Sequence, residues 1–376
     1  MAIRPCPSVY EFFAGGGLAG LGLAPDSDGP GFRTVFANDL DPAKARAFAA
    51  NHPDVPLRVG DVGSLTPDDL PGRPDLCWAS SPCQDLSLAG ARGGLTARRS
   101  GAFWGFWRLM QGLDAQGRGP RLVVIENVVG LLTSGGGADF AAVCGAMVAA
   151  GYRVGALEMD AAHWLPQSRP RLFIVGLRDG SAPTSSGPDG PFHSPRLIAA
   201  QAGLPPAVRE AWAWWRLPPP PRRNLDLAAV LEPDEAVDWL SPDQTRDLLA
   251  LMAPLHRARL DAALASGDRA VAAGFRRVRT EQGRKVQRLE LRFDGLAGCL
   301  RTPSGGSSRQ YVIVGQDGRA RARRLMGREC ARLMGVPDDY RLPGSQSAAL
   351  KLMGDAVAVP VVRALMQRLL APALDA

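Results

Sequence analysis

Residues 8–20 read SVYEFFAGGGLAG, an apolar run of strand-like composition that ends in a glycine-rich turn. Gly15, Gly17 and Gly20 have the spacing of a nucleotide-binding fingerprint, and Asp39 follows about twenty residues later, at the end of the next apolar run. Glycines allow the backbone to approach a ligand, and a carboxylate at the next strand end accepts hydrogen bonds from ribose hydroxyls. The segment predicts a cofactor-binding strand–turn–helix unit, although a turn with a purely structural role remains the alternative.

Short apolar runs alternate with helix-like segments up to about Arg178, which is the pattern of a parallel α/β sheet. The predicted strands are residues 8–13, 34–37, 57–59, 75–79, 122–126, 154–158 and 172–177. The predicted helices between them are residues 42–51, 103–115 and 139–150. We expect an open, doubly wound sheet, which binds ligands at the carboxyl ends of its strands.

The composition changes after this region. Residues 180–195 are rich in Gly, Pro and Ser, which predicts a linker. Beyond it we expect one amphipathic helix near residues 245–265, and a helical pattern resumes at about residue 322. We therefore expect three parts: residues 1–180, a smaller second domain (181–319) and a helical part (320–376).

Positive charge is concentrated in one stretch. The chain of 376 residues carries a net charge of +7, and residues 271–310 alone hold nine basic and three acidic residues. A solvated basic face is one interpretation. Contact with a nucleic acid is the other, and it is favoured if a catalytic site for a nucleic acid lies elsewhere in the chain.

Cysteine usage and hydropathy indicate the compartment. The six cysteines include no Cys-x-x-Cys pair, so we expect neither a zinc site nor a disulfide framework. We read no secretory signal at the start of the chain and no apolar run that approaches the ~20 residues needed to span a bilayer. A cytoplasmic protein with no membrane partner and no metal is expected.

Two reactive side chains follow predicted neighbouring strands. Cys83 stands in the loop Ser80–Gln84, after the run 75–79, and Glu126 ends the run 122–126. Both belong to the same sheet edge, so a thiol and a carboxyl would share a pocket. A buried, inert cysteine and a solvated strand end are the alternatives.

The segment 167–171 reads QSRPR, at the start of the last predicted strand. Alternate residues of an extended segment face the same way, so Gln167, Arg169 and Arg171 would form one polar row. Such a row can bind a phosphate or the edge of a pyrimidine. An ordinary charged start of a strand is the alternative.

In this order, FAGGG, ND, GD, PCQ, ENV and QxRxR resemble the motifs of the DNA cytosine-5 methyltransferase family of bacteria and phages. The later RECARLMGVPDDY and GDAVAVPVVRAL do so too, and the resemblance covers about residues 8–178 and 320–370. It implies the fold of an S-adenosylmethionine-dependent methyltransferase, with residues 1–180 as the catalytic and cofactor-binding domain and residues 181–319 as the target-recognition domain. Residues 320–376 would be a helical part that returns to the catalytic domain. The resemblance also implies double-stranded DNA as the substrate, a monomer, and a cognate restriction endonuclease as a partner.

The resemblance assigns roles residue by residue. Cys83 would be the nucleophile, Glu126 would contact the cytosine ring, and Arg169 and Arg171 would secure the base and its backbone. Pro82 would shape the nucleophile's loop beside the cofactor. The other residues implied to hold S-adenosylmethionine are Phe13, Gly15, Gly16, Asp39, Leu40, Asp61, Val62 and Asp355. Those expected on the DNA side are Ser87, Gln167 (which would also support its loop), Arg301 and Arg309.

Asp355 departs from the family pattern, because the motif usually reads Gly-Asn-x-Val and this chain has Gly354-Asp355-Ala356-Val357. A carboxylate accepts a hydrogen bond from the ammonium group of the cofactor but cannot donate one. Two rival functions remain open. A nicotinamide-dependent oxidoreductase would explain only the glycine turn and Asp39, and would leave the other motifs without a role. An RNA cytosine-5 methyltransferase would share the motifs, but the Cys-Phe-Thr tripeptide typical of that subgroup is absent from this chain.

Overall fold

The computed structural model describes residues 6–26, 29–82, 101–302 and 309–375. The chain forms two compact units. The first comprises Met1–Asp160, Pro170–Pro220 and Val357–Ala376, and the second comprises Ala161–Arg169 and Pro221–Ala356. The chain thus passes between the units four times. These crossing points differ from the domain limits at 180 and 319 expected from composition, which remain a prediction.

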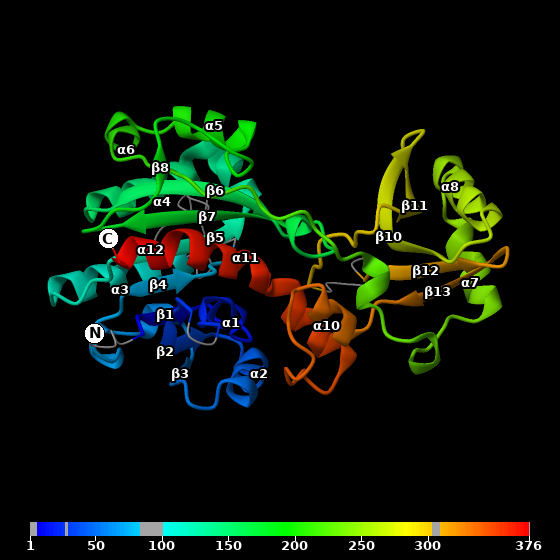
Figure 1. The fold of residues 1–376 in the computed structure, drawn as a ribbon, viewed down its shortest axis with the longest axis horizontal. Helices are drawn as coiled ribbons and strands as arrows, with labels where there is room; N and C mark the ends of the chain where they lie inside the picture. The colour runs from blue at the N-terminus through cyan, green and yellow to red at the C-terminus, as the bar shows by residue number, and fades with distance from the viewer. Residues whose placement is uncertain (1–5, 27–28, 83–100, 303–308, 376) are drawn as a thin grey trace. The chain divides into compact units, whose positions relative to one another are not determined.

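A seven-stranded sheet forms the centre of the first unit, in the order β3-β2-β1-β4-β5-β7-β6 (Figure 1). Its strands are β1 (Ser8–Phe12), β2 (Arg33–Asp39), β3 (Leu57–Val59), β4 (Leu76–Ala79), β5 (Leu122–Val128), β6 (Arg153–Asp160) and β7 (Pro170–Leu177). Strands β1 to β5 pair in parallel, whereas β7 is antiparallel to both β5 and β6. The prediction of a parallel sheet is wrong at β7, because the nine residues between β6 and β7 are fewer than a parallel crossover needs.

Helices cover both faces of this sheet. Alternate strand residues, such as Tyr10 and Phe12, join one core with α3 and α4. On the opposite face Glu11 contacts α1, which packs against α11. The helices are α1 (Leu18–Leu23), α2 (Pro42–Asn51), α3 (Ala102–Ala115), α4 (Ala138–Ala149), α5 (Pro195–Ala202), α6 (Pro206–Glu210), α11 (Val359–Leu365) and α12 (Ala371–Asp375).

The segment expected to be a linker belongs to the first unit. It contains the short strand β8 (Thr184–Ser185), which pairs with β9 (Trp214–Trp215), and it buries Phe192. The following tryptophans pack on the sheet and its helices: Trp212 lies edge-on to Phe140, with 6.2 Å between ring centroids, and Trp215 is only 1% exposed. Strand pairing and apolar packing therefore hold residues 180–195 on the first unit, although their composition predicted a linker.

The second unit is built on a four-stranded antiparallel sheet, in the order β11-β10-β12-β13. Its strands are β10 (Ala270–Glu281), β11 (Arg284–Arg292), β12 (Tyr311–Gln316) and β13 (Arg319–Arg324), and its helices are α7 (Pro242–Ala250), α8 (Pro254–Ala265), α9 (Gly327–Arg332) and α10 (Gln346–Asp355). The single helix expected near 245–265 is two helices, because Pro254 lacks an N–H and begins a new one.

Two helical stretches, Val129–Ala149 and Gln346–Asp375, are long and apolar enough to cross a membrane by length and composition alone. The first is interrupted at Ser134–Gly136, where the backbone is not helical. Phe140, Val143 and Met147 in this stretch lie in the core of the first unit. Burial in the core thus explains its apolar character.

Candidate active site

Positive φ angles shape the glycine turn after β1. Phe13 and Gly15 have φ angles of 57° and 58°, in the left-handed region. A Cβ atom added to Gly15 would meet nothing within 4 Å, so open space adjoins the turn. Asp39, at the end of β2, holds this turn, since its carboxylate accepts hydrogen bonds from the backbone N–H of Gly15 (2.7 Å) and of Asp41 (2.8 Å).

The other residues implied for the cofactor in the first unit lie at the ends of β2 and β3. Leu40 is 68% exposed, which is unusual for a large apolar side chain. Asp61 accepts a hydrogen bond from the N–H of Gly63 (2.8 Å), and Val62 is buried in the core. Asn38 joins the two strand ends by donating to the carbonyl of Gly60 (3.1 Å). Asp39, Leu40, Asp61 and Val62 thus cluster at the edge that carries the glycine turn.

The loop that holds the expected nucleophile begins at the end of β4. Cys83 and Ser87 lie outside the described residues, whereas Ser81 is buried and Pro82 is exposed. The side chain of Asn127 donates to the carbonyl of Ser81 (3.0 Å). This hydrogen bond joins the first residues of the loop to the carboxyl end of the neighbouring strand β5.

Glu126 precedes Asn127 on β5 and is only 7% exposed. Its carboxylate forms an ion pair with Arg171, which lies on the adjacent strand β7, at 3.3 Å between Oε1 and Nε. Both side chains are largely shielded from solvent, so water screens their attraction weakly. The sequence predicted both residues as parts of one site, and the structure places them in contact.

Gln167 and Arg169 precede the start of β7 and belong to the second unit. Gln167 is fully buried, and its side chain donates to Leu333 O (2.6 Å) and accepts from Leu300 N–H (3.0 Å). Arg169 is 2% exposed and donates to the carbonyls of Leu300 (2.9 Å) and Gly354 (3.1 Å). Both side chains contact Leu300, and they hold backbone segments of the second unit together. The expected row of three side chains that includes Arg171 stays a prediction.

The remaining expected residues also lie in the second unit. Asp355 is exposed and accepts a hydrogen bond from the hydroxyl of Thr302. Arg301 is exposed, and Arg309 donates to the hydroxyl of Ser347 (2.7 Å). Gly354 has a packing reason to be glycine, because an added Cβ would lie 2.6 Å from the backbone of Arg301 and Thr302.

Two residues of this region were not singled out from the sequence. One is Asn127, whose hydrogen bond to Ser81 is described above. The other is Glu11, which accepts from the N–H of Gly20 (3.0 Å) inside the fold. Burial raises the pKa of Glu11 to about 8, although the backbone N–H groups of Gly20 and Ala19 lower it. A single carboxylate within the apolar run SVYEFF was the available signal for Glu11.

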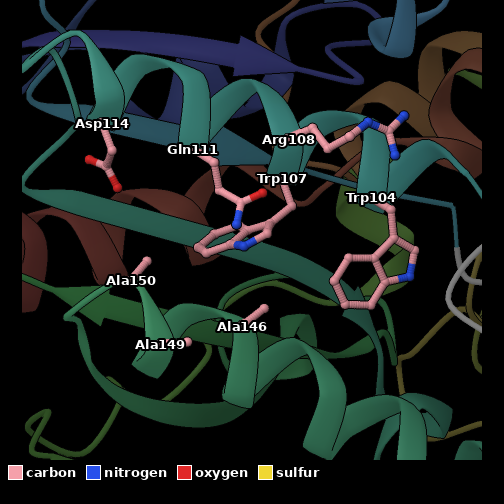
Figure 2. Close-up of a pocket in the computed structure, with 8 residues that line it drawn as sticks. All are labelled: Trp104, Trp107, Arg108, Gln111, Asp114, Ala146, Ala149 and Ala150. Atoms are coloured by element: carbon pink, nitrogen blue, oxygen red, sulfur yellow. The ribbon is translucent and has the colours of Figure 1, made fainter.

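A pocket of about 340 Å³ lies between α3 and α4 (Figure 2). Trp104, Trp107 and Asp114 of α3 line it, opposite Ala146 and Ala149 of α4. None of the residues expected to take part in the reaction lines it. The carboxylate of Asp114 is bound by Arg178 in a bidentate ion pair, so its charge is already satisfied within the fold.

The fold is shared with solved methyltransferases. The structure of the S. pombe Dnmt2 methyltransferase superimposes with a TM-score of 0.60 at 17% sequence identity, and the match covers 96% of this chain and 97% of that chain. The strand order with an antiparallel β7, and the glycine turn held by Asp39, therefore define the first unit as the methyltransferase form of the Rossmann-like fold.

Sequence comparison specifies the family. The chain is 26% identical to the Type II methyltransferase M.AgeI of Thalassovita gelatinovora, over 96% of this chain and 98% of that protein. It is 27% identical to M.NgoBI of Neisseria gonorrhoeae, over 95% and 90% of the two chains. The family model of the C-5 cytosine-specific DNA methylases matches residues 8–214 and 263–371. The chain belongs to this family, and it is a DNA cytosine-5 methyltransferase.

Proposed function

We propose that the chain transfers a methyl group from S-adenosylmethionine to carbon 5 of a cytosine flipped out of a specific duplex sequence, through a covalent bond to Cys83. One observation carries the proposal. The hydrogen bond between Asn127 and Ser81 ties the start of the Cys83 loop to the strand end where Glu126 stands. Membership of the family leaves no support for a nicotinamide-dependent oxidoreductase.

The residues at the ends of β1 to β3 fit S-adenosylmethionine. Open space beside Gly15 admits a ligand close to the backbone. The Asp39 oxygens each accept one backbone hydrogen bond and retain a lone pair for a ribose hydroxyl. Leu40 offers an exposed apolar surface to the adenine ring, and Asp61 and Val62 would meet its edge. We assign Phe13, Gly16, Pro82 and Asp355 to the same ligand, with Asp355 accepting from its ammonium group.

Cys83 and Glu126 would divide the chemistry. The Cys83 thiolate adds to carbon 6 of cytosine, forming an S–C bond and making carbon 5 electron-rich. Glu126, sharing a proton with ring nitrogen 3, stabilises the charge that develops there, and Arg171 fixes the Glu126 carboxyl in place. S-adenosylmethionine, when bound, supplies an electrophilic methyl group for carbon 5. Loss of the carbon 5 proton to a base then expels the thiolate. A stacked base cannot be reached in this way, so the cytosine must leave the duplex.

The second unit would recognise DNA. Arg301 and Arg309 would contact phosphates through their positive charge, and Ser87 would contact a phosphate through its neutral hydroxyl. Gln167 and Arg169 would contribute by holding the backbone at Leu300, because Gln167 accepts from the Leu300 N–H and Arg169 donates to the Leu300 carbonyl. In the cell we propose a cytoplasmic monomer acting on duplex DNA, with a cognate restriction endonuclease as its partner in a bacterium or a phage-infected cell.

Bisulfite sequencing of DNA from cells that express the chain tests the reaction and reads the target sequence at once. We expect methylation of one cytosine in a short recurring sequence. Cys83→Ser should abolish it, and Glu126→Gln should lower kcat by about 100-fold or more while leaving cofactor binding unchanged. Methylation by Cys83→Ser at the rate of the unmodified chain would refute the covalent mechanism.

A further inference from the structure

His52 lies against the glycine turn, although more than thirty residues separate the two in the chain. It directly follows α2, and its backbone N–H donates to the carbonyl of Phe48 (2.8 Å), which closes the last turn of that helix. The rings of His52 and Phe48 are in contact, with 4.8 Å between their centroids. Phe48 is itself buried in one cluster with Ala14. The end of α2 thus packs on the turn.

The His52 ring meets the turn at two consecutive residues. It forms a hydrogen bond with the backbone of Gly16. At Gly17, whose φ angle is 79°, an added Cβ atom would lie 2.5 Å from His52 Nε2 and 2.6 Å from His52 Cδ2. Only a residue without a side chain permits the ring to lie so close to the backbone at this position.

The two ring nitrogens of His52 have different surroundings. Nε2 is buried and has no hydrogen-bond partner in the part of the chain that the structure describes, so the bond to Gly16 belongs to Nδ1. Burial lowers the pKa of His52 below its ordinary value, whereas the bond to Gly16 raises it. A hydrogen bond raises the pKa of a histidine when the ring is the donor. Nδ1–H therefore donates to the Gly16 carbonyl.

The unpaired nitrogen makes histidine a costly residue here if packing is its only role. A buried acceptor without a partner destabilises a fold. A phenylalanine ring would contact Phe48 equally well and would bury no polar atom. What the histidine adds is its Nδ1–H, which is bonded to the glycine turn.

Two side chains from different elements thus hold successive residues of the turn. The Asp39 carboxylate, at the end of β2, accepts from the N–H of Gly15 (2.7 Å), and His52 donates to Gly16. A glycine-rich backbone loses more conformational freedom on ordering than any other. Holding it in one conformation before a ligand arrives removes part of that cost from binding.

We propose that His52 is a positioning residue for S-adenosylmethionine, whose Nδ1–H fixes the Gly16 carbonyl and so holds the glycine turn in the conformation that binds the cofactor. This inference rests on the proposed function and extends its cofactor site to the end of α2. His52 acts through the turn, so it raises the fraction of the protein that is competent to bind. Once the cofactor is bound, the reacting groups are unaffected.

The test compares three full-length variants. His52→Phe keeps a ring and loses the donor. His52→Asn loses the ring and keeps an N–H as many bonds from the backbone as Nδ1, and His52→Leu matches the shape of Asn without a donor. Calorimetry without DNA measures the affinity for S-adenosylmethionine. The Phe and Leu variants should bind about 2- to 12-fold more weakly than the unmodified chain, and the Asn variant within about twofold of it.

Two further measurements separate positioning from a purely structural role. The KM for S-adenosylmethionine should rise by the same factor as the dissociation constant while kcat stays unchanged, because only binding is affected. Urea midpoints should fall in both the Asn and the Leu variant, since both lose the ring contact with Phe48. Stability would then group the Asn variant with Leu, whereas affinity would group it with the unmodified chain.

Three outcomes would overturn the inference: unmodified affinity in the Phe variant, equal weakening in the Asn and Leu variants, or a loss of kcat at saturating cofactor. An affinity that follows the urea midpoints across the three variants would equally show that His52 only packs. Failure of the proposed function has a different signature, because the unmodified chain would then bind no S-adenosylmethionine at all.

Discussion

At the scale of single residues, two carboxylates at the centre of the first unit have opposite surroundings. Glu126 lies near the end of β5 beside an arginine, whereas Glu11 lies inside β1 with only backbone N–H groups as donors in the contacts described. Burial without a cation disfavours the charged form of a carboxylate, which is the situation of Glu11. Glu126 therefore lies in the candidate active site, whereas Glu11 supports α1, the helix that follows the glycine turn.

Glu11 makes the stability of the protein depend on pH. Its folded pKa of about 8 exceeds the ordinary value of 4.5, chiefly through burial, so folding favours the protonated form. The stability it contributes is complete below pH 4.5 and is lost as the pH rises through about 8. Glu11→Gln keeps an oxygen for the Gly20 N–H and cannot ionise. Relative to the unmodified chain it should gain on the order of a few kcal/mol between pH 6 and pH 9.

Urea unfolding of both proteins at the two pH values measures this gain. A difference that stays constant between pH 6 and pH 9 would contradict the assignment. The affinity for S-adenosylmethionine is a second readout, because α1 follows directly on the glycine turn. This affinity should fall as the pH rises, and it should fall more in the unmodified chain than in the Glu11→Gln variant.

At the scale of elements, close backbone contacts fix how strands and loops pack. Gly155 in the middle of β6 is an example, since an added Cβ would lie 2.0 Å from the carbonyl oxygen of Ala213 and 2.5 Å from Trp215 Nε1. The tryptophan segment thus lies directly on the strand. Only a residue without a side chain permits this approach.

Gly155→Ala should therefore lower the free energy of unfolding by about 1–3 kcal/mol, because the backbone must shift. Gly187→Ala is the matched control: it lies in the same unit with nothing within 4 Å of an added Cβ, and it should change stability by less than about 0.5 kcal/mol. Urea midpoints measure both values. Equal midpoints for the two variants would show that the segment moves freely over β6.

The sequence predicted all seven strands of the large sheet to within a few residues, because most of them are apolar runs bounded by polar residues. It could not predict the direction of β7, since an apolar run such as Leu172–Leu177 reads the same in either orientation. The hydrogen-bond partners of Gln167 and Arg169 could not be predicted from the sequence either. Those partners lie more than 130 residues away along the chain, and no local pattern encodes such contacts.

At the scale of the whole molecule, the last twenty residues complete the first unit. Val362 of α11 fits against Gly22 of α1, where an added Cβ would be 2.6 Å away, and Arg363 donates to Leu21 O (2.9 Å). The C-terminal helices thus pack on the helix that follows the glycine turn. The resemblance implied such a return for residues 320–376, and the structure assigns residues 357–376 to the first unit.

A chain that ends at Ala356 should therefore lose S-adenosylmethionine binding and aggregate, because the apolar surface of α1 is uncovered. A chain that ends at Leu374 keeps α11 and should keep the elution volume and the activity of the unmodified chain. Size-exclusion chromatography and cofactor binding distinguish the two. A monomeric, cofactor-binding chain ending at Ala356 would show that the first unit folds without its C-terminal helices.

The nine residues between β6 and β7 belong to the second unit, although they lie between two strands of the first. Exchange of residues 221–356 for the corresponding part of a relative, by recombination or by design, would leave Gln167 and Arg169 behind. The incoming segment would have to offer backbone carbonyls where Leu300, Leu333 and Gly354 now present theirs. A segment that placed these carbonyls elsewhere would leave buried donors of Gln167 and Arg169 without partners, which destabilises the fold.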